Sequence, residues 1–217
     1  MAIVASDLHG NLSKVKRFLE YLPDIEHVFA GDILDSRVPH SVEEQTEALK
    51  LLINSPAILL WGNHEQNYWT PPRMCSGYQS DGAGTYTHIL SENKSRFKNA
   101  HLADGYIITH AGIHNRLEVP SKVTTCVSRL NYNKVTNMNA IGYSRGGDRP
   151  SGGIFWYDYK HDYDKLSQKF NQVFGHCPSK FPWEDRQEGY HHVCVNTSEQ
   201  KENFWVFDTS TQQLVEL

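Results

Sequence analysis

Two aspartates three residues apart follow an apolar run that ends at a glycine. The run covers residues 28–30, and Asp32 and Asp35 come directly after Gly31. Two carboxylates are rarely buried in a hydrophobic core. At the end of a strand, by contrast, both would lie at one edge of a sheet. We predict that Asp32 bridges two metal ions and that Asp35 orients a catalytic histidine.

Four further short apolar runs also end in side chains that bind metal ions. They deliver, in chain order, Asp7 with His9, then Asn63, then His110, then His176. Asp7 and His9 are two residues apart, so at an extended strand end both point the same way and can bind one ion. Carboxylate, amide and imidazole ligands without a thiolate suit Mn, Fe or Zn better than Mg alone. His114 is the alternative to His110, but the strand end favours His110.

Two divalent ions about 3.5–4 Å apart suit phosphoryl chemistry. Such a pair lowers the pKa of a bridging water, binds phosphate oxygens and neutralises developing negative charge, so no protein nucleophile is required. The remaining task is to protonate the leaving oxygen. His64 follows the ligand Asn63 immediately and so projects elsewhere, and Asp35 is available to hold its second nitrogen. We therefore predict that His64 is the general acid and that Asp35 is its partner.

The elements that position these residues begin with three successive strand, loop and helix units. Strands are expected at residues 2–6, 28–30 and 57–61, and helices after Ser13 and from 41 to about 54. Ser13 is placed to cap the first helix, and Ser41 with Glu44 forms a capping box at the start of the second. Three such units in series predict a parallel sheet whose site loops meet at one end.

The remaining chain predicts a second sheet. A helix is expected at 87–97, and strands at 105–112, 173–178, 190–195, 204–207 and 214–216. The last three runs follow one another without helices, which indicates a partly antiparallel sheet. Two sheets packed face to face with helices outside give an α/β fold, a four-layer αββα sandwich of two mixed β-sheets. We expect residues 1–217 to form a single domain.

Two stretches lack helical or strand periodicity. Residues 66–84 are expected to be a loop insertion near the substrate, in which Tyr68, Trp69 and Tyr78 either stack on a substrate base or cover the site. Residues 145–153 are rich in glycine and proline and are expected to form a mobile loop.

Composition describes an ordinary globular protein of 217 residues with a formal net charge of −4. This charge argues against an extended footprint on duplex nucleic acid. No run of about 18 apolar residues is present, and the residues before Asp7 do not resemble a signal peptide. The four cysteines include no C-x-x-C pair, so reduced thiols are expected. We expect a cytoplasmic protein, in the host cytoplasm if it is phage-encoded, with no membrane partner.

The five motifs together resemble those of the calcineurin-like metallophosphoesterases. In chain order they are Asp7-x-His9-Gly10, Gly31-Asp32-x-x-Asp35, Gly62-Asn63-His64-Glu65, His110-Ala111-Gly112 and Gly175-His176-Cys177-Pro178. The resemblance implies a dinuclear phosphoesterase that uses two divalent metal ions, with Mn preferred and Fe, Zn or Ni as alternatives. One ion would be held by Asp7, His9 and Asp32, and the other by Asp32, Asn63, His110 and His176.

The last motif, Gly175-His176-Cys177-Pro178, indicates which group within this superfamily the chain resembles. Many of its phosphodiesterases have a second histidine where this chain has Pro178, so the chain is more similar to serine/threonine phosphoprotein phosphatases and symmetrical diadenosine tetraphosphatases. That group usually has an arginine directly after the second aspartate, as a bidentate phosphate ligand. Here Ser36 takes that place. Arg37, Arg145 and Arg149 are the candidate phosphate ligands, and each is equally well explained as a solvated surface charge.

Three functions compete at this point. The first is hydrolysis of phosphate monoesters, with a phosphorylated protein as substrate. The second is hydrolysis of diadenosine tetraphosphate or another nucleotide, for which the aromatic residues of 66–84 would hold the base. The third is a non-catalytic scaffold that binds proteins through the same face. The presence of both His64 and Asp35 weighs against the scaffold, because a scaffold does not need a general acid.

Overall fold

The computed structural model describes residues 1–38, 40–69, 75–197 and 199–217. Within these ranges the strands are β1 (Ala2–Ala5), β2 (Glu26–Phe29), β3 (Ile58–Leu60), β4 (Phe97–Lys98), β5 (His101–Ala103), β6 (Tyr106–Ile108), β7 (Asn171–Phe174), β8 (Trp183–Gln187), β9 (Tyr190–Cys194), β10 (Trp205–Asp208) and β11 (Gln213–Glu216). The α-helices are α1 (Leu12–Glu20), α2 (Val42–Asn54), α3 (Asn63–Trp69), α4 (Ala83–Glu92) and α5 (Val123–Asn131). Two short 3-10 helices are η1 (Lys94–Arg96) and η2 (Tyr143–Arg145).

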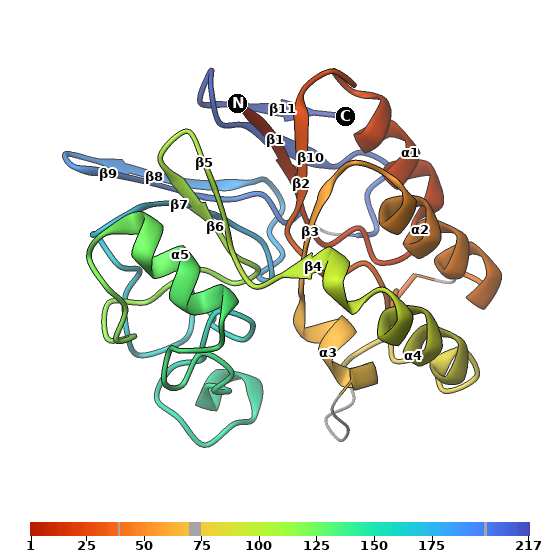
Figure 1. Ribbon diagram of the computed structural model, residues 1–217, viewed down its shortest axis with the longest axis horizontal. Helices are drawn as coiled ribbons and strands as arrows, with labels where there is room; N and C mark the ends of the chain where they lie inside the picture. Colours follow the sequence, from red (N-terminus) through yellow and green to blue (C-terminus); the bar gives the residue numbers. More distant parts are fainter. Residues whose placement is uncertain (39, 70–74, 198) are drawn as a thin grey trace.

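Two mixed sheets form the centre of the molecule. The first has the order β11-β10-β1-β2-β3-β4, in which β1 to β4 are parallel and β10 runs antiparallel to β1. The second has the order β5-β6-β7-β9-β8, in which β6, β7 and β9 are parallel. Figure 1 shows α1, α2 and α4 on one side of the sheets and α5 with long loops on the other. The predicted four-layer arrangement of two mixed sheets is confirmed.

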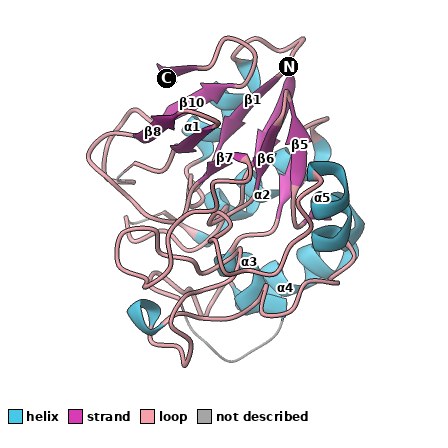
Figure 2. Ribbon diagram, turned by 90° about the vertical axis from the view of Figure 1, so that its left-hand side faces the viewer, coloured by secondary structure: helices cyan, strands magenta, loops and turns pink. Residues whose placement is uncertain are grey.

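Side chains that alternate along the central strands separate two buried apolar cores. Ile3 and Phe29 pack toward the helices, whereas Val4 and Val28 pack toward the second sheet, as the two-residue period of a strand requires. The core between the sheets also contains Leu60, Tyr106, Ile108, Val173, Val193 and Phe207. This shared core holds the parallel strands of both sheets against one another. Seen from the side, the strands occupy the upper part of the molecule and long loops gather toward its lower end (Figure 2).

Helix caps agree with the sequence at one helix and differ at another. Ser41 caps α2 as predicted, because its side chain accepts a hydrogen bond from the backbone N–H of Glu44 over 3.1 Å. Helix α1 begins two residues earlier than predicted, because Asn11 rather than Ser13 is its N-cap. The Asn11 side chain accepts a hydrogen bond from the backbone N–H of Lys14 over 2.9 Å. Both side chains satisfy a backbone donor that the helix itself leaves free.

The C-terminal strands correct the expected topology. Of the three runs predicted for the second sheet, only β9 joins it, while β10 and β11 extend the first sheet. Strand β10 pairs with β1, with Val4 opposite Phe207, so the free edge of β1 is covered. Strand periodicity identifies such segments as strands but carries no information about which edge they pair with.

The expected loop at 66–84 is also partly wrong. Helix α3 covers its first residues and α4 begins at Ala83, earlier than the helix expected at 87–97. Residues 70–74 of that stretch lie outside the described residues. No helix in the part of the chain that the structure describes is long and apolar enough to cross a membrane.

Candidate metal centre

The predicted site residues follow the ends of five parallel strands, β1, β2, β3, β6 and β7. Five of them have a left-handed backbone, with φ of 57° at Asp7, 45° at His9, 59° at Asp32, 66° at Asp35 and 69° at His176. This conformation is uncommon for any residue with a side chain and concentrates at functional sites. The sharp turns it produces aim the side chains across the strand ends. The local backbone is thus shaped for the site rather than for the sheet.

Four acceptor atoms converge at one half of the site. Oδ1 of Asn63 lies 2.9 Å from Nε2 of His110 and 2.9 Å from Nδ1 of His176. Oδ2 of Asp32 lies 3.3 Å from the same Nε2 atom of His110. Nδ1 of His110 faces the Ala30 carbonyl oxygen at 2.8 Å and therefore carries a proton, so Nε2 is the nitrogen that faces the cluster and can bind either a second proton or a metal ion.

Without a cation this convergence is unfavourable. The side-chain N–H of Asn63 donates to Sγ of Cys75 over 3.1 Å, so its oxygen is the atom that faces the cluster. Burial lowers the pKa of His110, but the charge and hydrogen bond of Asp32, the charge of Asp7 and the Ala30 carbonyl together outweigh burial and raise the pKa to about 9. The cluster therefore attracts positive charge. Oxygen and imidazole donors directed at one point fit a divalent transition metal ion.

The other half of the site contains Asp7, His9 and the same Asp32. Nε2 of His9 lies 4.0 Å from Oδ1 of Asp7, and Nδ1 of His9 faces the Leu34 carbonyl oxygen at 2.9 Å. Ligand atoms of His9, Asp32 and His64 lie within 4.8 Å of one another, as do those of Asp32, His110 and His176. Asp32 belongs to both groups, so its carboxylate lies between the two candidate ligand clusters.

His64 and Asp35 form a buried pair beside this cluster. Nδ1 of His64 lies 3.0 Å from Oδ2 of Asp35, and the Asp35 side chain is completely buried. Nε2 of His64 lies 3.7 Å from Oδ2 of Asp32 and so faces the cluster. Burial lowers the pKa of His64, but Asp32 and Asp35 together outweigh it and place the pKa above its usual value. The arrangement matches a general acid whose orientation is set by a carboxylate.

Glu65 holds the loop that carries Asp32. Its carboxylate accepts hydrogen bonds from four backbone N–H groups, those of Asp32, Ile33, Leu34 and Gly62. Glu65 ends the Gly62-Asn63-His64-Glu65 motif, but the sequence alone assigns it no specific role. The left-handed turn at Asp32 is therefore held by the buried carboxylate of Glu65, which lies on helix α3 after the neighbouring strand β3.

A pocket of about 260 Å³ opens over the cluster and contains two of the three candidate arginines. It is lined by Asp32, Arg37, Asn63, His64, Cys75, Ser76, Arg145, Trp156, His176 and Pro178. Nη2 of Arg145 pairs with Asp158 at 2.9 Å, while its Nε is buried and has no partner among the described residues. Nε of Arg37 pairs with Glu199 at 2.9 Å. Carboxylates thus hold both guanidinium groups at the pocket wall.

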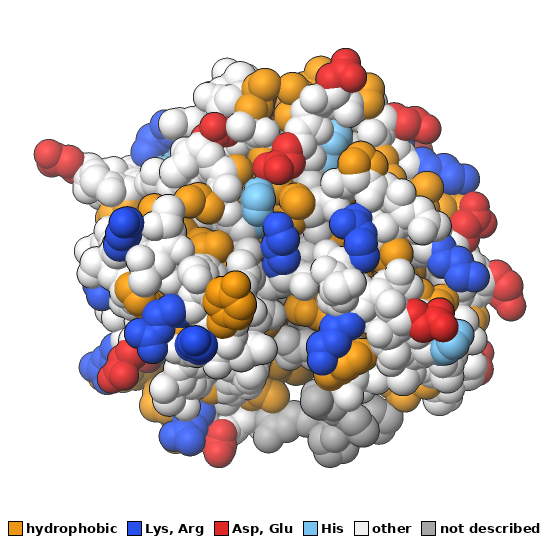
Figure 3. Space-filling view, viewed as in Figure 1, with side chains coloured by type: hydrophobic (Ala, Val, Ile, Leu, Met, Phe, Trp, Pro, Cys, Tyr) orange, Lys and Arg blue, Asp and Glu red, His pale blue; other side chains and the backbone are white. Residues whose placement is uncertain are grey.

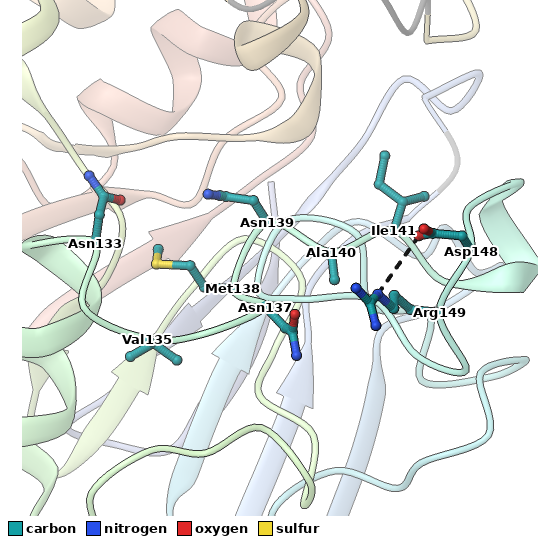
Figure 4. Close-up of a pocket in the computed structure, with 9 residues that line it drawn as sticks. All are labelled: Asn133, Val135, Asn137, Met138, Asn139, Ala140, Ile141, Asp148 and Arg149. Atoms are coloured by element: carbon teal, nitrogen blue, oxygen red, sulfur yellow. Dashed lines mark ion pairs between the residues drawn. The ribbon is translucent and has the colours of Figure 1, made fainter.

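Arg149 lies elsewhere. It pairs with Asp148 at 3.9 Å and lines a separate pocket with Asn137, Asn139 and Ile141 (Figure 4). His114, the alternative to His110, lies 3.6 Å from Asp164 and is in neither group of ligand atoms.

The aromatic residues of 66–84 have different surroundings: Tyr68 contacts the site residue Asp35, whereas Trp69 packs away from it. The Tyr68 side chain is buried, stacks on Tyr78 with ring centroids 5.3 Å apart, and donates its hydroxyl to Asp35. Trp69 packs near Trp61 and lies under the Lys94 ammonium at 4.1 Å. Trp156 was not singled out by the sequence, although it lines the pocket; the turn-rich stretch around it gives no periodic signal.

The chain belongs to the calcineurin-like phosphoesterase family, whose sequence model matches residues 2–204. Members of this family are phosphoester hydrolases that use divalent metal ions, and the clusters described above supply candidate ligands. The protein is therefore a hydrolase of the metallophosphoesterase class. No curated protein sequence matches the chain.

Two of the solved structures with the same fold show what the chain resembles. The cold-active protein-tyrosine phosphatase of a psychrophilic Shewanella species has a TM-score of 0.66 and 15% identity, covering 99% of this chain and 76% of its own. A candidate diadenosine tetraphosphatase has a TM-score of 0.59 and 15% identity, covering 100% of this chain and 92% of its own. At these identities the likeness concerns the fold alone.

Proposed function

We propose that the protein hydrolyses phosphate monoesters, with a serine or threonine phosphoprotein as the substrate, and that its two metal ions are manganese. The observation that carries the proposal is the placement of the Asp35–His64 pair beside the ligand cluster around Asp32, within one pocket. Two bound divalent ions would lower the pKa of a water, hold phosphate oxygens and offset their charge. The protein then has to supply ligands, anion binding and a proton.

The residues divide these tasks among themselves. The proposed ligands are Asp7, His9 and Asp32 for one ion and Asp32, Asn63, His110 and His176 for the other. Asp35 holds the Nδ1 side of His64, so the proton on Nε2 points into the pocket. We propose that His64 gives this proton to the leaving oxygen as the ester bond breaks, which is worth a factor of about 100 to 10,000 in rate.

The shape and charge of the pocket favour a monoester. Arg37 and Arg145 both line it, so two guanidinium groups stand at the pocket wall where they can bind phosphate oxygens. Its volume of about 260 Å³ suits one phosphoryl group and a short part of the group that carries it. The Tyr68 side chain is buried, with one ring face on Tyr78 and its hydroxyl on Asp35, so Tyr68 is not placed to stack on a nucleotide base.

Two further proposals concern the chain as a whole. We propose that residues 1–217 form one domain, which the continuous core between the two sheets supports. We also propose a cytoplasmic location, which the four free cysteines support because disulfides are rare in reducing compartments. On the face seen in Figure 3, Lys and Arg side chains are spread singly and in small groups rather than in one continuous patch, which argues against an extended nucleic-acid footprint on this face.

The test is turnover of four substrates after chelation, with and without Mn²⁺. The substrates are p-nitrophenyl phosphate, a phosphoserine peptide, bis-p-nitrophenyl phosphate and diadenosine tetraphosphate, and Asp32→Asn is the inactive control. We expect Mn²⁺-dependent release of phosphate from both monoesters, with kcat/KM at least about tenfold above the diester. Faster cleavage of the tetraphosphate than of the peptide would assign the protein to nucleotides. No metal-dependent turnover of any substrate would favour the scaffold.

A further inference from the structure

Helix α3 brings a third side chain to the Asp35–His64 pair. His64 and Tyr68 are four residues apart on this helix, so they lie on the same face one turn from each other. Both contact the same carboxylate: Nδ1 of His64 lies 3.0 Å from Oδ2 of Asp35, and the Tyr68 hydroxyl donates to Oδ1. One carboxylate is thus held at both oxygens by one short helix.

The Tyr68 ring has little freedom to move. Its residue is only 5% exposed, its ring stacks on Tyr78, and the ring of Tyr86 meets it edge-on with centroids 5.2 Å apart. Burial, followed by the charge of Asp35, raises the pKa of the Tyr68 hydroxyl. The hydroxyl is therefore a permanent donor, and its position is fixed by aromatic packing on two sides.

Asp35 needs such a partner to point in one direction. A carboxylate held through one oxygen can rotate about its last torsion, since that torsion is broad. The Asp35 backbone is itself held, because its N–H donates to Oε1 of Gln45 over 3.0 Å. With the backbone fixed and Oδ1 occupied, Oδ2 is left facing Nδ1 of His64. The direction of Nε2, on the far side of the imidazole, follows from that contact.

We propose that Tyr68 is a positioning residue of the phosphoesterase reaction, which acts through Asp35 to aim His64 at the leaving oxygen. This inference rests on the proposed function, because it assigns Tyr68 a role only if His64 is the general acid. The competing explanation is that Tyr68 merely fills the core between α3 and α4. The two differ in one consequence: a positioning residue affects poor leaving groups more than good ones, whereas a core residue affects both alike.

Tyr68→Phe removes only the hydroxyl, and Tyr86→Phe is its matched control. The Tyr86 side chain is completely buried and its ring touches the Tyr68 ring, but its hydroxyl donates to Gln79 rather than to Asp35. Both variants lose one buried hydroxyl from the same aromatic cluster. Their thermal midpoints and bound-metal content report any general damage to the fold.

The measurement is kcat for p-nitrophenyl phosphate, which has a good leaving group, and for a phosphoserine peptide, which has a poor one. Tyr68→Phe is expected to lower kcat for the peptide about tenfold, to lower it much less for the nitrophenyl ester, and to leave KM and metal content unchanged. Tyr86→Phe is expected to leave the ratio of the two kcat values as in the unaltered protein. Equal losses on both substrates, or equal ratios in the two variants, would overturn the proposal.

A double-mutant cycle with Asp35→Asn tests whether Tyr68 acts through Asp35. We expect Tyr68→Phe to cause no further loss of peptide kcat once Asp35 has been changed, because coupled residues are not additive. Independent, multiplying losses would contradict the proposal. His64→Asn separates this outcome from the proposed function: if that variant keeps the kcat ratio of the unaltered protein, His64 is not the general acid and the proposed function itself fails.

Discussion

Nε2 of His110 and Nδ1 of His176 lie 3.2 Å apart in the interior of the protein. Nδ1 of His110 faces the Ala30 carbonyl oxygen and carries a proton, so Nε2 is the nitrogen left to bind a cation, either a second proton or a metal ion. We predict that the purified protein binds two Mn²⁺ ions per chain and that chelation lowers its thermal midpoint. His176→Ala should reduce the stoichiometry from two to one, measured by calorimetry and by elemental analysis. Two ions in that variant would exclude His176 as a ligand.

Glu65 is expected to control metal affinity without touching a metal. In Glu65→Gln, the amide N–H₂ that replaces one oxygen cannot accept from the backbone N–H groups of Asp32 and Gly62. Loosening this loop should weaken Mn²⁺ binding by about 10- to 100-fold, as losses of ligand-supporting hydrogen bonds do. Titration calorimetry measures the affinity. Glu47→Gln, on an exposed side chain, is the control and should bind as the unaltered protein does.

If Glu65→Gln and Glu47→Gln bind Mn²⁺ equally well, the turn at Asp32 does not depend on Glu65. Urea unfolding of the metal-free variant gives a second readout. A buried donor without an acceptor costs about 1–3 kcal/mol, so Glu65→Gln should unfold at lower urea.

Arg145 and Arg149 belong to the same segment but should differ in their effect on KM. Arg145→Ala removes a guanidinium from the pocket wall and should raise KM for a phosphoserine peptide by about 10- to 100-fold, the value of a hydrogen bond between charged groups. Arg149→Ala should leave KM unchanged, because Arg149 pairs with Asp148 at a separate pocket. Steady-state kinetics with Mn²⁺ saturating measures both. The reverse order of effects would reassign the phosphate ligand.

Acid should weaken the second sheet through His192. Its Nε2 donates to the carbonyl oxygens of Ser167 and Phe170, and burial lowers the pKa of the ring below its usual value of 6.5. As the pH falls below 6.5, the imidazole of His192 becomes protonated in the unfolded chain but stays neutral in the folded chain. The contribution of His192 to the free energy of unfolding is therefore full above pH 6.5 and is lost as the pH falls.

Urea midpoints measured from pH 7.5 to pH 5.5 check this pH dependence. His192→Gln keeps a donor for the two carbonyl groups but does not titrate, so its midpoint should fall less steeply with acid. An equal slope in both proteins would exclude His192 as the source.

The sequence predicts the site better than it predicts the connections around it. Asp35 and His64 are 29 positions apart, yet the strand-end pattern predicts their contact, because parallel strands that precede helices end at one edge of a sheet. The pattern does not predict which sheet β10 joins, since either edge accepts a strand of alternating side chains. It names Tyr68 only as a residue that stacks on a substrate base or covers the site and does not predict its contact with Asp35, although the four-residue spacing of His64 and Tyr68 places both on one helix face.

The candidate arginines show a different limit. Arg145 and Arg149 stand in one glycine-rich stretch without periodicity, and only the folded loop separates the one that lines the pocket from the one that does not.

The central claim is that His64 protonates the leaving group of a phosphate monoester. Its most direct measurement is kcat of His64→Asn for a phosphoserine peptide, with the variant loaded with Mn²⁺ and its ion content measured in the same sample. We predict a loss of about 100- to 10,000-fold in kcat while two ions remain bound. A fully loaded His64→Asn protein that turns over the peptide as fast as the unaltered protein would contradict the claim.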